Sequence, residues 1–323
     1  MTIKQLIEAW NNFWFAPDSV LPVCLLRMYL GVVTIIWCIL LAPEVTNFYG
    51  THRMMPTAGG NDWFGFTVLN VFEVLPRSDS TATGALLVTA VAAMALTLGL
   101  LTRLGLLVLV VCLVSFAHDC PLIMHSGDTF LRVLMFLLLF APCNKMLSLD
   151  QVLWKRLRRN GADDVPRDQF GDPVWPRWVT RLIQLQVCAI YYQTFWAKLR
   201  GESWLDGTAV YYTSHLVEFS KFSLPYVFEH LWTIKMLTWG TLFIEFSLFT
   251  LIWVKELRYF VLLAAIVMHL SIDWTMNIPL FEWVMMGSFI SFVSAADIRR
   301  ALAFVQNRLG QRLSGKSSIR ALE

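Results

Sequence analysis

The stretch from residue 179 to 198 carries polar side chains within an otherwise apolar sequence. Five residues recur there at spacings of three and four, so they share one stripe of a helix. They are Gln184, Cys188, Tyr191, Phe195 and Lys198. A polar stripe that ends in a lysine faces protein or a cavity, not lipid. Lys198 is then either an amine that reaches the membrane interface or a desolvated amine that serves as a general base.

Other polar residues interrupt apolar stretches, where an unpaired polar group is costly. His269 and Asp273 are four residues apart and lie on one helix face, so Asp273 could orient the imidazole. A hydrogen bond between helices, without chemistry, is the alternative. Glu245 lies near the middle of its stretch, and its candidate counter-ions are Arg132 and Arg27.

The segment from His118 to Asp128 concentrates side chains of metal-ligand type. Its members are His118, Asp119, Cys120, His125 and Asp128. Their spacing matches no tight ligand pattern, so no metal is expected. Cys38 and Cys120 could pair near one face. The sequence has no Gly-rich phosphate loop, CxxC pair, nucleophile elbow or HExxH motif.

The composition is that of a membrane protein. Of 323 residues, 57% are hydrophobic and 15% are charged, whereas soluble domains have ~45–50% and ~25%. These values exclude a soluble globule and a disordered chain, and six cysteines are too few for a disulfide-stapled mini-protein. With 26 basic and 23 acidic residues, nothing favours nucleic acid. The expected surroundings are the lipid bilayer.

We expect an all-α integral membrane protein whose 323 residues form a single transmembrane domain, with a bundle of about eight transmembrane helices over residues 20–297. The apolar stretches lie near 20–43, 82–101, 104–118, 128–143, 179–198, 236–254, 259–276 and 279–297. Several are shorter than the ~20 residues that cross ~30 Å of hydrocarbon. Residues 1–19 include an amphipathic segment from Thr2 to Phe15, which we expect to lie in the membrane interface and not to be a cleaved signal.

The basic residues predict an orientation. With the N-terminus in the cytoplasm, the inner segments hold 18 Lys and Arg and the outer segments hold 6, as the positive-inside rule requires. We therefore expect a multi-pass protein of the inner cell membrane with both termini cytoplasmic. Residues 144–178 and 298–323 become a basic loop and tail against anionic headgroups. The long outer segments 44–81 and 199–235 are expected to form interfacial or re-entrant helices.

A longer pattern resembles a known family. It consists of Arg181, Gln184, Gln186, Tyr191, Lys198, Leu199, Trp204, Gly207 and Tyr211. At these spacings the residues resemble the membrane region of vitamin K-dependent γ-carboxylases and of their bacterial relatives, the horizontally transferred transmembrane (HTTM) domain proteins. Further matching elements are His125–Ser126, Ser148–Leu149–Asp150, His269, Ile278, Phe281, Trp283, Val284 and Met285. The similarity covers most of residues 20–297.

The resemblance implies roles for several residues. In the carboxylases, the lysine that matches Lys198 deprotonates reduced vitamin K. The anion reacts with dioxygen and yields a base that takes a γ-proton from glutamate. By resemblance, Lys198 is the catalytic base, and His269 and His125 are catalytic residues that position the quinol. The cofactor is then a reduced quinone of the vitamin K or menaquinol type, bound by Tyr191, Gln184, Trp204 and Tyr211.

The resemblance implies a quinol- and oxygen-dependent enzyme that modifies a peptide or small substrate at the extracytoplasmic face. Carboxylases carry a large extramembrane domain after the bundle, whereas 26 residues follow Asp297 here, so carboxylation of a tethered protein is not expected. Compact relatives in toxin-maturation systems imply a secreted peptide substrate or a small membrane partner.

If the protein is an enzyme, an apolar cavity is expected beside Lys198. Two alternative functions remain. One is a non-catalytic membrane subunit that docks a partner in peptide or toxin maturation or export. That subunit predicts that Lys198 points to headgroups or pairs with Glu202 or Asp206. The other is a transporter, which is disfavoured because the sequence has no internal repeat.

Overall fold

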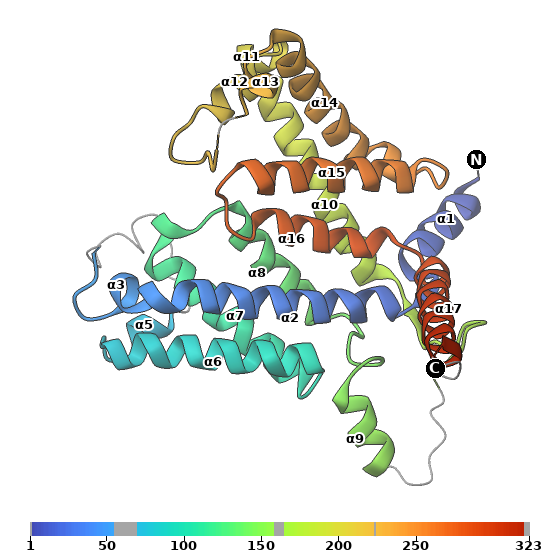
Figure 1. The fold of residues 1–323 in the computed structure, drawn as a ribbon. Coiled ribbons are helices and arrows are strands. Elements are labelled where there is room, and N and C mark those ends of the chain that lie inside the picture. Colours follow the sequence, from blue (N-terminus) through green and yellow to red (C-terminus); the bar gives the residue numbers. More distant parts are fainter. Residues whose placement is uncertain (1, 55–69, 158–164, 223, 320–323) are drawn as a thin grey trace.

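The computed structural model describes residues 2–54, 70–157, 165–222 and 224–319, and almost all of its regular elements are helices (Figure 1). The longer helices are α1 (Ile3–Phe15), α2 (Leu21–Leu41), α6 (Asp79–Leu98), α7 (Thr102–Asp119), α8 (Ser126–Leu138), α9 (Leu149–Leu157), α10 (Trp178–Lys198), α14 (Leu231–Phe249), α15 (Arg258–Thr275), α16 (Phe281–Ser288) and α17 (Ala295–Ile319). The short ones are η1 (Ala42–Glu44), α3 (Val45–Tyr49), α5 (Val71–Val74), η3 (Pro121–Ile123), α11 (Glu202–Leu205), α12 (Ala209–Ser214), α13 (Pro225–Phe228), η4 (Leu251–Trp253) and η5 (Phe289–Phe292). Strands β1 (Pro17–Ser19) and β2 (Val174–Pro176) pair antiparallel, with Pro17 opposite Pro176.

Each of the eight apolar stretches contains a helix, and the all-α membrane class is confirmed. Within the described residues, four helical segments are long and apolar enough to cross a bilayer: Leu21–Tyr49, Asp79–Leu98, Thr102–Asp119 and Arg258–Thr275. A fifth arises if the bent pair Phe281–Phe292 and Ala295–Asn307 is taken as one span. Helix α8 has 13 residues and rises only ~20 Å, less than the ~30 Å of hydrocarbon.

Helix α2 runs through the middle of the bundle (Figure 1). Its buried side chains include Leu26, Leu30 and Val33, while Val32 and Ile39 are exposed, as expected for a helix with one packed face. It packs chiefly against α6. The two helices approach closely at Gly31, where an added Cβ atom would lie 2.3 Å from Thr97 Oγ1. Small residues allow such close contact between membrane helices.

One end of the bundle is held together around Arg27, and we call it the Arg27 end. The fully buried Arg27 guanidinium donates to the carbonyl oxygens of Thr97, Cys143 and Leu147, at 3.1, 3.0 and 2.6 Å. Further contacts at this end join segments distant in sequence. They are the β1–β2 pair, the Asp150 carboxylate on the amides of Leu101 and Thr102, the Arg299–Asp172 ion pair and the Tyr259–Asp297 hydrogen bond.

The opposite end is held together around Asp119, and we call it the Asp119 end. The Asp119 carboxylate pairs with Arg53 at 2.8 Å and with Arg77 at 3.1 Å. At the loop between α15 and α16, the amide of Asn277 donates to the carbonyl of Phe219 at 2.6 Å. Successive loops therefore alternate between the two ends.

The flanking segments follow the predictions in part. The predicted N-terminal helix forms as α1, and Thr2 and Gln5 make a capping box at its start. The segment 199–235 forms the short helices α11, α12 and α13. Most of the apolar run predicted in 44–81 lies outside the described residues. The suggested Cys38–Cys120 disulfide is wrong. Both cysteines are buried, and both have free thiols.

Candidate functional site

The polar stripe of α10 faces the protein, as predicted. Gln184, Cys188 and Tyr191 are all buried. The side-chain amide of Gln184 donates to the carbonyl of Ser291 at 2.6 Å and its oxygen accepts from Arg181 at 2.8 Å. The NH2 group and the oxygen of the Gln184 side chain are thus both used in holding α10 near the Arg27 end. These hydrogen bonds give Gln184 a structural role.

Lys198, at the last residue of α10, forms an ion pair with Glu245 of α14. The Lys198 side chain is 24% exposed and that of Glu245 is 6% exposed. The amine also lies 4.9 Å from the centre of the Trp204 ring, a cation–π contact. Within the described part of the chain, the second carboxylate oxygen of Glu245, Oε2, is buried and accepts no hydrogen bond.

This geometry corrects two assignments. Arg132 and Arg27 are wrong as counter-ions of Glu245, because Arg27 binds carbonyls at the Arg27 end and Arg132 donates to Thr129 on its own helix. Glu202 and Asp206, close to Lys198 in sequence, are not its carboxylate partner either. Hydrogen bonds from Thr208 to the Asp206 carboxylate lower the pKa of Asp206.

A second group of polar side chains lies inside the bundle, between α10, α15 and α16. Tyr191 Oη lies 2.6 Å from His269 Nε2, and His269 Nδ1 lies against Glu282 Oε2. Tyr191 and His269 are 3% exposed and Glu282 is 0% exposed. Glu282 is in the first turn of α16, where the helix dipole favours a negative charge. A hydroxyl, an imidazole and a carboxylate in series are the parts of a proton-transfer chain.

Glu282 is the residue that the sequence-based prediction missed. Asp273 was the expected partner of His269, and this is wrong: the imidazole turns to α10 and α16 and both of its nitrogens are used there. The signal for Glu282 was present, since it is an acid within an apolar stretch, between the motif residues Phe281 and Trp283.

The two polar groups are neighbours along α10. Tyr191 of one group and Lys198 of the other lie on the same stripe of α10. Seven residues, about two helical turns or ~10 Å of rise, separate Tyr191 from Lys198. Aromatic rings fill the space between α10 and α14 at this level: Phe195 lies 5.6 Å from the rings of Phe246 and of Phe249.

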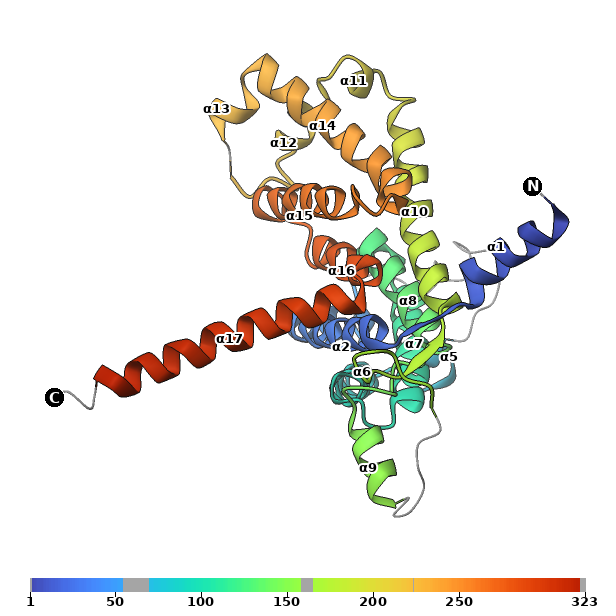
Figure 2. The same cartoon turned by 90° about the vertical axis from the view of Figure 1, so that its right-hand side faces the viewer.

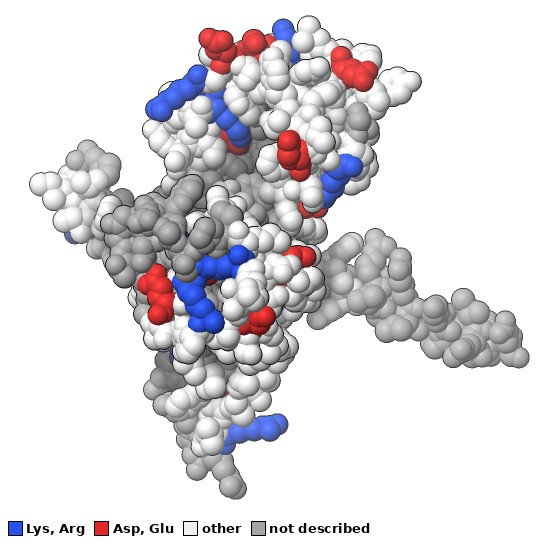
Figure 3. Space-filling model, turned by 90° about the vertical axis from the view of Figure 1, so that its left-hand side faces the viewer, with Lys and Arg blue, Asp and Glu red and all other residues white. Residues whose placement is uncertain are grey.

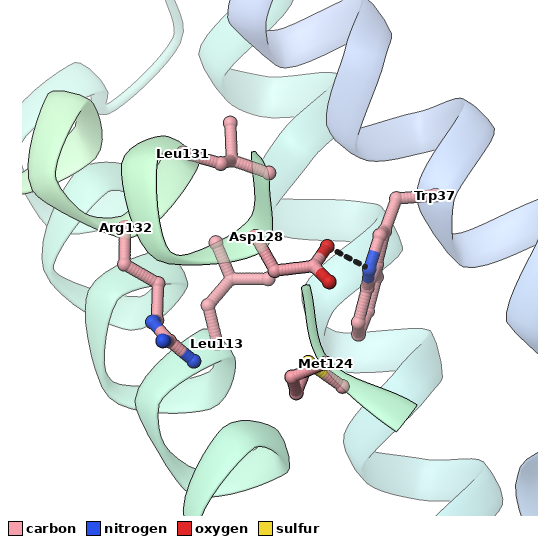
Figure 4. A pocket seen from close by; sticks show the side chains of 6 residues that line it. All are labelled: Trp37, Leu113, Met124, Asp128, Leu131 and Arg132. Atoms are coloured by element: carbon pink, nitrogen blue, oxygen red, sulfur yellow. Dashed lines mark hydrogen bonds between the residues drawn. The ribbon is translucent and has the colours of Figure 1, made fainter. Parts of the chain in front are cut away.

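His125 and Asp128 belong to a different cluster, at the start of α8. Asp128 accepts a hydrogen bond from Trp37 Nε1 at 3.1 Å, and Arg132 lies on the other side of the same hollow (Figure 4). The hollow is partly open and has essentially no room for a water-sized molecule between its side chains, so it is far smaller than typical ligand pockets. His125 caps α8, with Nδ1 accepting from the amide of Gly127 at 3.0 Å.

The structure therefore brings some of the predicted residues together and separates others. Lys198 and Trp204 are in contact, and so are Tyr191 and His269. The ring of His125 lies 6.2 Å from the ring of Phe281, the residue before Glu282, and its hydrogen bonds are made within the start of α8. Tyr211 of α12 lies against His215, the residue after that helix, with tilted rings whose centres are 4.2 Å apart. In the described residues, no three His, Cys, Asp or Glu side chains converge as metal ligands.

Comparisons with known proteins place the whole bundle in one family. The family model described as "HTTM domain" matches residues 27–296. The chain is also similar to the "Uncharacterized protein YitO" of Bacillus subtilis (strain 168), with 26% identity over 145 residues. That alignment covers 43% of this chain and 46% of the relative, so the match spans less than half the length of that protein. No solved structure matches the chain.

Proposed function

Because the chain belongs to the HTTM domain family, which is related to the vitamin K-dependent γ-carboxylases, we propose that this membrane protein is a quinol- and oxygen-dependent enzyme. It modifies a peptide or a small substrate at the extracytoplasmic side of the membrane. The observation that carries the proposal is the Lys198–Glu245 pair, an amine and a buried carboxylate that keeps one unused acceptor oxygen.

In the proposed topology, the chain crosses the inner membrane eight times and the Arg27 end faces the cytoplasm. The alternation of loop contacts supports this count. Five segments meet at the Arg27 end: β1, β2, and the segments that contain Asp150, Asp172 and Asp297. Along the chain, each of them comes after zero, four or eight of the eight helices. An even number of crossings places all five on the same side of the membrane. Helices α1 and α17, the first and last of the chain, both start from the Arg27 end and extend from it in different directions (Figure 2), as an even number of crossings requires. Helix α8 crosses with the help of its flanking residues.

The residues around Lys198 supply two features that suit a reduced quinone, an acceptor oxygen and an aromatic ring, whereas the hollow between Trp37 and Arg132 lies elsewhere. Such a molecule supplies two ring hydroxyls and two electrons, and its anion reacts with dioxygen. Glu245 Oε2 is an acceptor that a hydroxyl can use, and a buried acceptor is stabilised by a donor. The ring of Trp204 lies over the Lys198 amine, and the rings of Phe195 and Phe246 pack against each other on the same two helices. Planar rings prefer such apolar, aromatic surroundings.

Lys198 and Glu245 act as one proton-accepting unit in this proposal. An ammonium ion cannot accept a proton, and a paired lysine carries that charge. When the proton of the pair resides on Glu245, the amine is neutral and is a general base. The low dielectric around a nearly buried carboxylate reduces the cost of this transfer, because both partners become uncharged together.

Tyr191, His269 and Glu282 form a second proton-transfer chain, about two helical turns before Lys198 along α10. Tyr191 Oη donates its proton to His269 Nε2, whose Nδ1 proton is held by Glu282. Glu282 stabilises the imidazolium that forms, as a carboxylate does for a catalytic histidine. His125 contributes by holding the start of α8 against Phe281.

An oxidation assay tests the proposal. Purified protein in nanodiscs is mixed with menaquinol in air-saturated buffer containing bicarbonate, and quinol loss and epoxide formation are followed by chromatography. We expect turnover in the wild type and its loss in Lys198→Ala. Lys235→Ala is the matched control, because Lys235 also lies over a tryptophan, Trp239, at 5.6 Å. Turnover absent in the wild type, or equal in both variants, overturns the proposal.

A second candidate function is a non-catalytic subunit that docks a partner. It is favoured by the apolar side chains exposed in the segment between α12 and α14. Val217 and Tyr226 are 87% and 86% exposed there. This function requires that a small membrane partner or secreted peptide bind the segment, and that Lys198→Ala leave binding unchanged.

A further inference from the structure

Three helices extend from the Arg27 end, away from the bundle. Viewed along α2, helices α1, α9 and α17 point in three different directions, across the α2 axis (Figure 2). The helical segment Ala295–Asn307 is bent by 107° from the segment Phe281–Phe292. If α2 and α16 cross the bilayer, then all three extended helices run along its surface.

Helix α1 has one apolar face that the protein does not cover. Ile3, Leu6, Ile7 and Trp10 recur at spacings of three and four and are 54–80% exposed. No residue of α1 is buried. The opposite face carries polar residues such as Lys4 and Asn12. A helix of this kind inserts its apolar face into the boundary between headgroups and acyl chains.

Helix α9 repeats this arrangement with basic residues added. Leu149, Val152, Leu153 and Leu157 lie at spacings of three and four and are all exposed. Lys155 and Arg156 occupy its last turn. Apolar groups with lysine and arginine beside them match a membrane surface, since the long basic side chains reach the headgroup phosphates while the leucines enter the acyl region.

Helix α17 presents a third such face. Ile298, Leu302 and Val305 follow the same spacing, and Leu302 and Val305 are exposed. Arg299 binds Asp172, so it fixes the helix to the bundle, whereas Arg300 remains exposed. The start of α17 is therefore rigidly attached, and its apolar face is directed by that attachment.

The charge distribution indicates which lipids these helices meet. Among the residues whose side chains the structure describes, the segments of the Arg27 end contain 12 basic and 7 acidic residues, and those of the Asp119 end contain 6 basic and 10 acidic residues. The Asp119 end shows acidic and basic side chains interspersed (Figure 3). Anionic headgroups attract a basic surface by ~1 kcal/mol per residue close to it. The excess of basic over acidic residues therefore favours anionic lipid at the Arg27 end.

We propose that α1, α9 and α17 form a collar that binds the anionic headgroups of one membrane leaflet, with the apolar faces in the acyl boundary and the basic side chains on the phosphates. The occupant is the bilayer and not a partner protein, because the three helices extend in three different directions (Figure 2). One flat surface reaches all three, and a bilayer is such a surface.

Spin labels test where the faces lie. Nitroxides are attached to cysteines introduced at Ile7, Leu153 and Leu302, with Asn12 and Lys155 as matched positions on the opposite faces. The protein is placed in nanodiscs containing phosphatidylglycerol. We expect the first three labels to be relaxed more by oxygen, which enters the bilayer, and the two controls more by a water-soluble nickel chelate. Equal accessibility to nickel on both faces, or protection from both reagents, overturns the proposal.

Retained lipid tests the charge preference. Native mass spectrometry of the full chain counts phosphatidylglycerol and phosphatidylcholine kept after purification from an equal mixture. We expect several-fold more phosphatidylglycerol in the wild type, and a loss of that preference in the double variant Lys155→Gln, Arg156→Gln. The double variant Arg200→Gln, Lys235→Gln at the Asp119 end should keep it. Equal retention of both lipids in the wild type overturns the proposal.

Discussion

The amine of Lys198 lies against the carboxylate of Glu245, 47 residues further along the chain, and joins the end of α10 to α14. Glu245 is nearly buried, so it depends on this contact for its charge to be compensated. The pair thus has two roles that experiments can separate. It holds two helices together, and it keeps an amine and a carboxylate within reach of one proton.

The structural role predicts a large effect of removing one partner. Lys198→Ala should lower the free energy of unfolding by about 3–5 kcal/mol, because it leaves a buried carboxylate without its cation. The double variant Lys198→Met, Glu245→Met should recover most of this loss. Thermal denaturation in mixed micelles measures both. If the double variant is as unstable as Lys198→Ala, the claim that Lys198 compensates the buried charge of Glu245 is contradicted.

The relay predicts an effect of charge without an effect on folding. Glu282→Gln keeps a hydrogen-bond acceptor for His269 but removes the negative charge. We expect quinol oxidation to slow on the order of 100-fold and its pH–rate profile to move, with the denaturation midpoint nearly unchanged. Tyr191→Phe should also slow quinol oxidation, and it should lower the denaturation midpoint as well, because it leaves the buried Nε2 of His269 without a partner. An unchanged rate and an unchanged profile would assign Glu282 to packing alone.

Arg27 predicts a purely structural effect. Arg27→Met leaves buried carbonyl groups of α6 and of the loop after α8 without their donor. An unsatisfied buried group costs ~1–3 kcal/mol, so the variant should lose at least ~3 kcal/mol of stability. Arg300→Met, at an exposed site, should change it by less than ~0.5 kcal/mol. Similar stabilities of the two variants would refute the role of Arg27.

The proposed topology predicts the sidedness of the two ends. Single cysteines at Arg156 and at Glu229 are treated with a membrane-impermeant maleimide on intact cells. The cysteine at position 229 should react directly, and the cysteine at 156 only after permeabilisation. The six native cysteines are buried and serve as the unlabelled background. Reaction of both positions in intact cells would contradict the proposed topology, in which positions 156 and 229 lie on opposite sides of the membrane.

The class, the helices and the packed stripe of α10 were predictable from the sequence. The composition distinguishes a membrane protein from a soluble one. The spacing of Gln184, Cys188 and Tyr191 places them on one face of a helix, whichever residues they contact. Each apolar stretch contains a helix because backbone groups in hydrocarbon must pair within their own segment.

The partners of the polar groups were not predictable in this way. Glu245 and His269 each had a plausible neighbour in sequence or type, and the packing of α10 against α14 and α16 selected Lys198 and Glu282 instead. Spacing along one helix says which side chains share a face but not where a ring turns. His269 turns away from Asp273 because Tyr191 and Glu282 bind both of its nitrogens.

The substitution Lys198→Arg tests the central claim most directly. Arginine keeps a positive charge for Glu245 but stays protonated and accepts no proton. If the pair takes a proton from reduced menaquinone, then Lys198→Arg should unfold at the wild-type temperature and lose quinol oxidation, while Lys235→Arg retains it. Wild-type rates of quinol oxidation in Lys198→Arg would show that the amine only pairs, and would contradict the account.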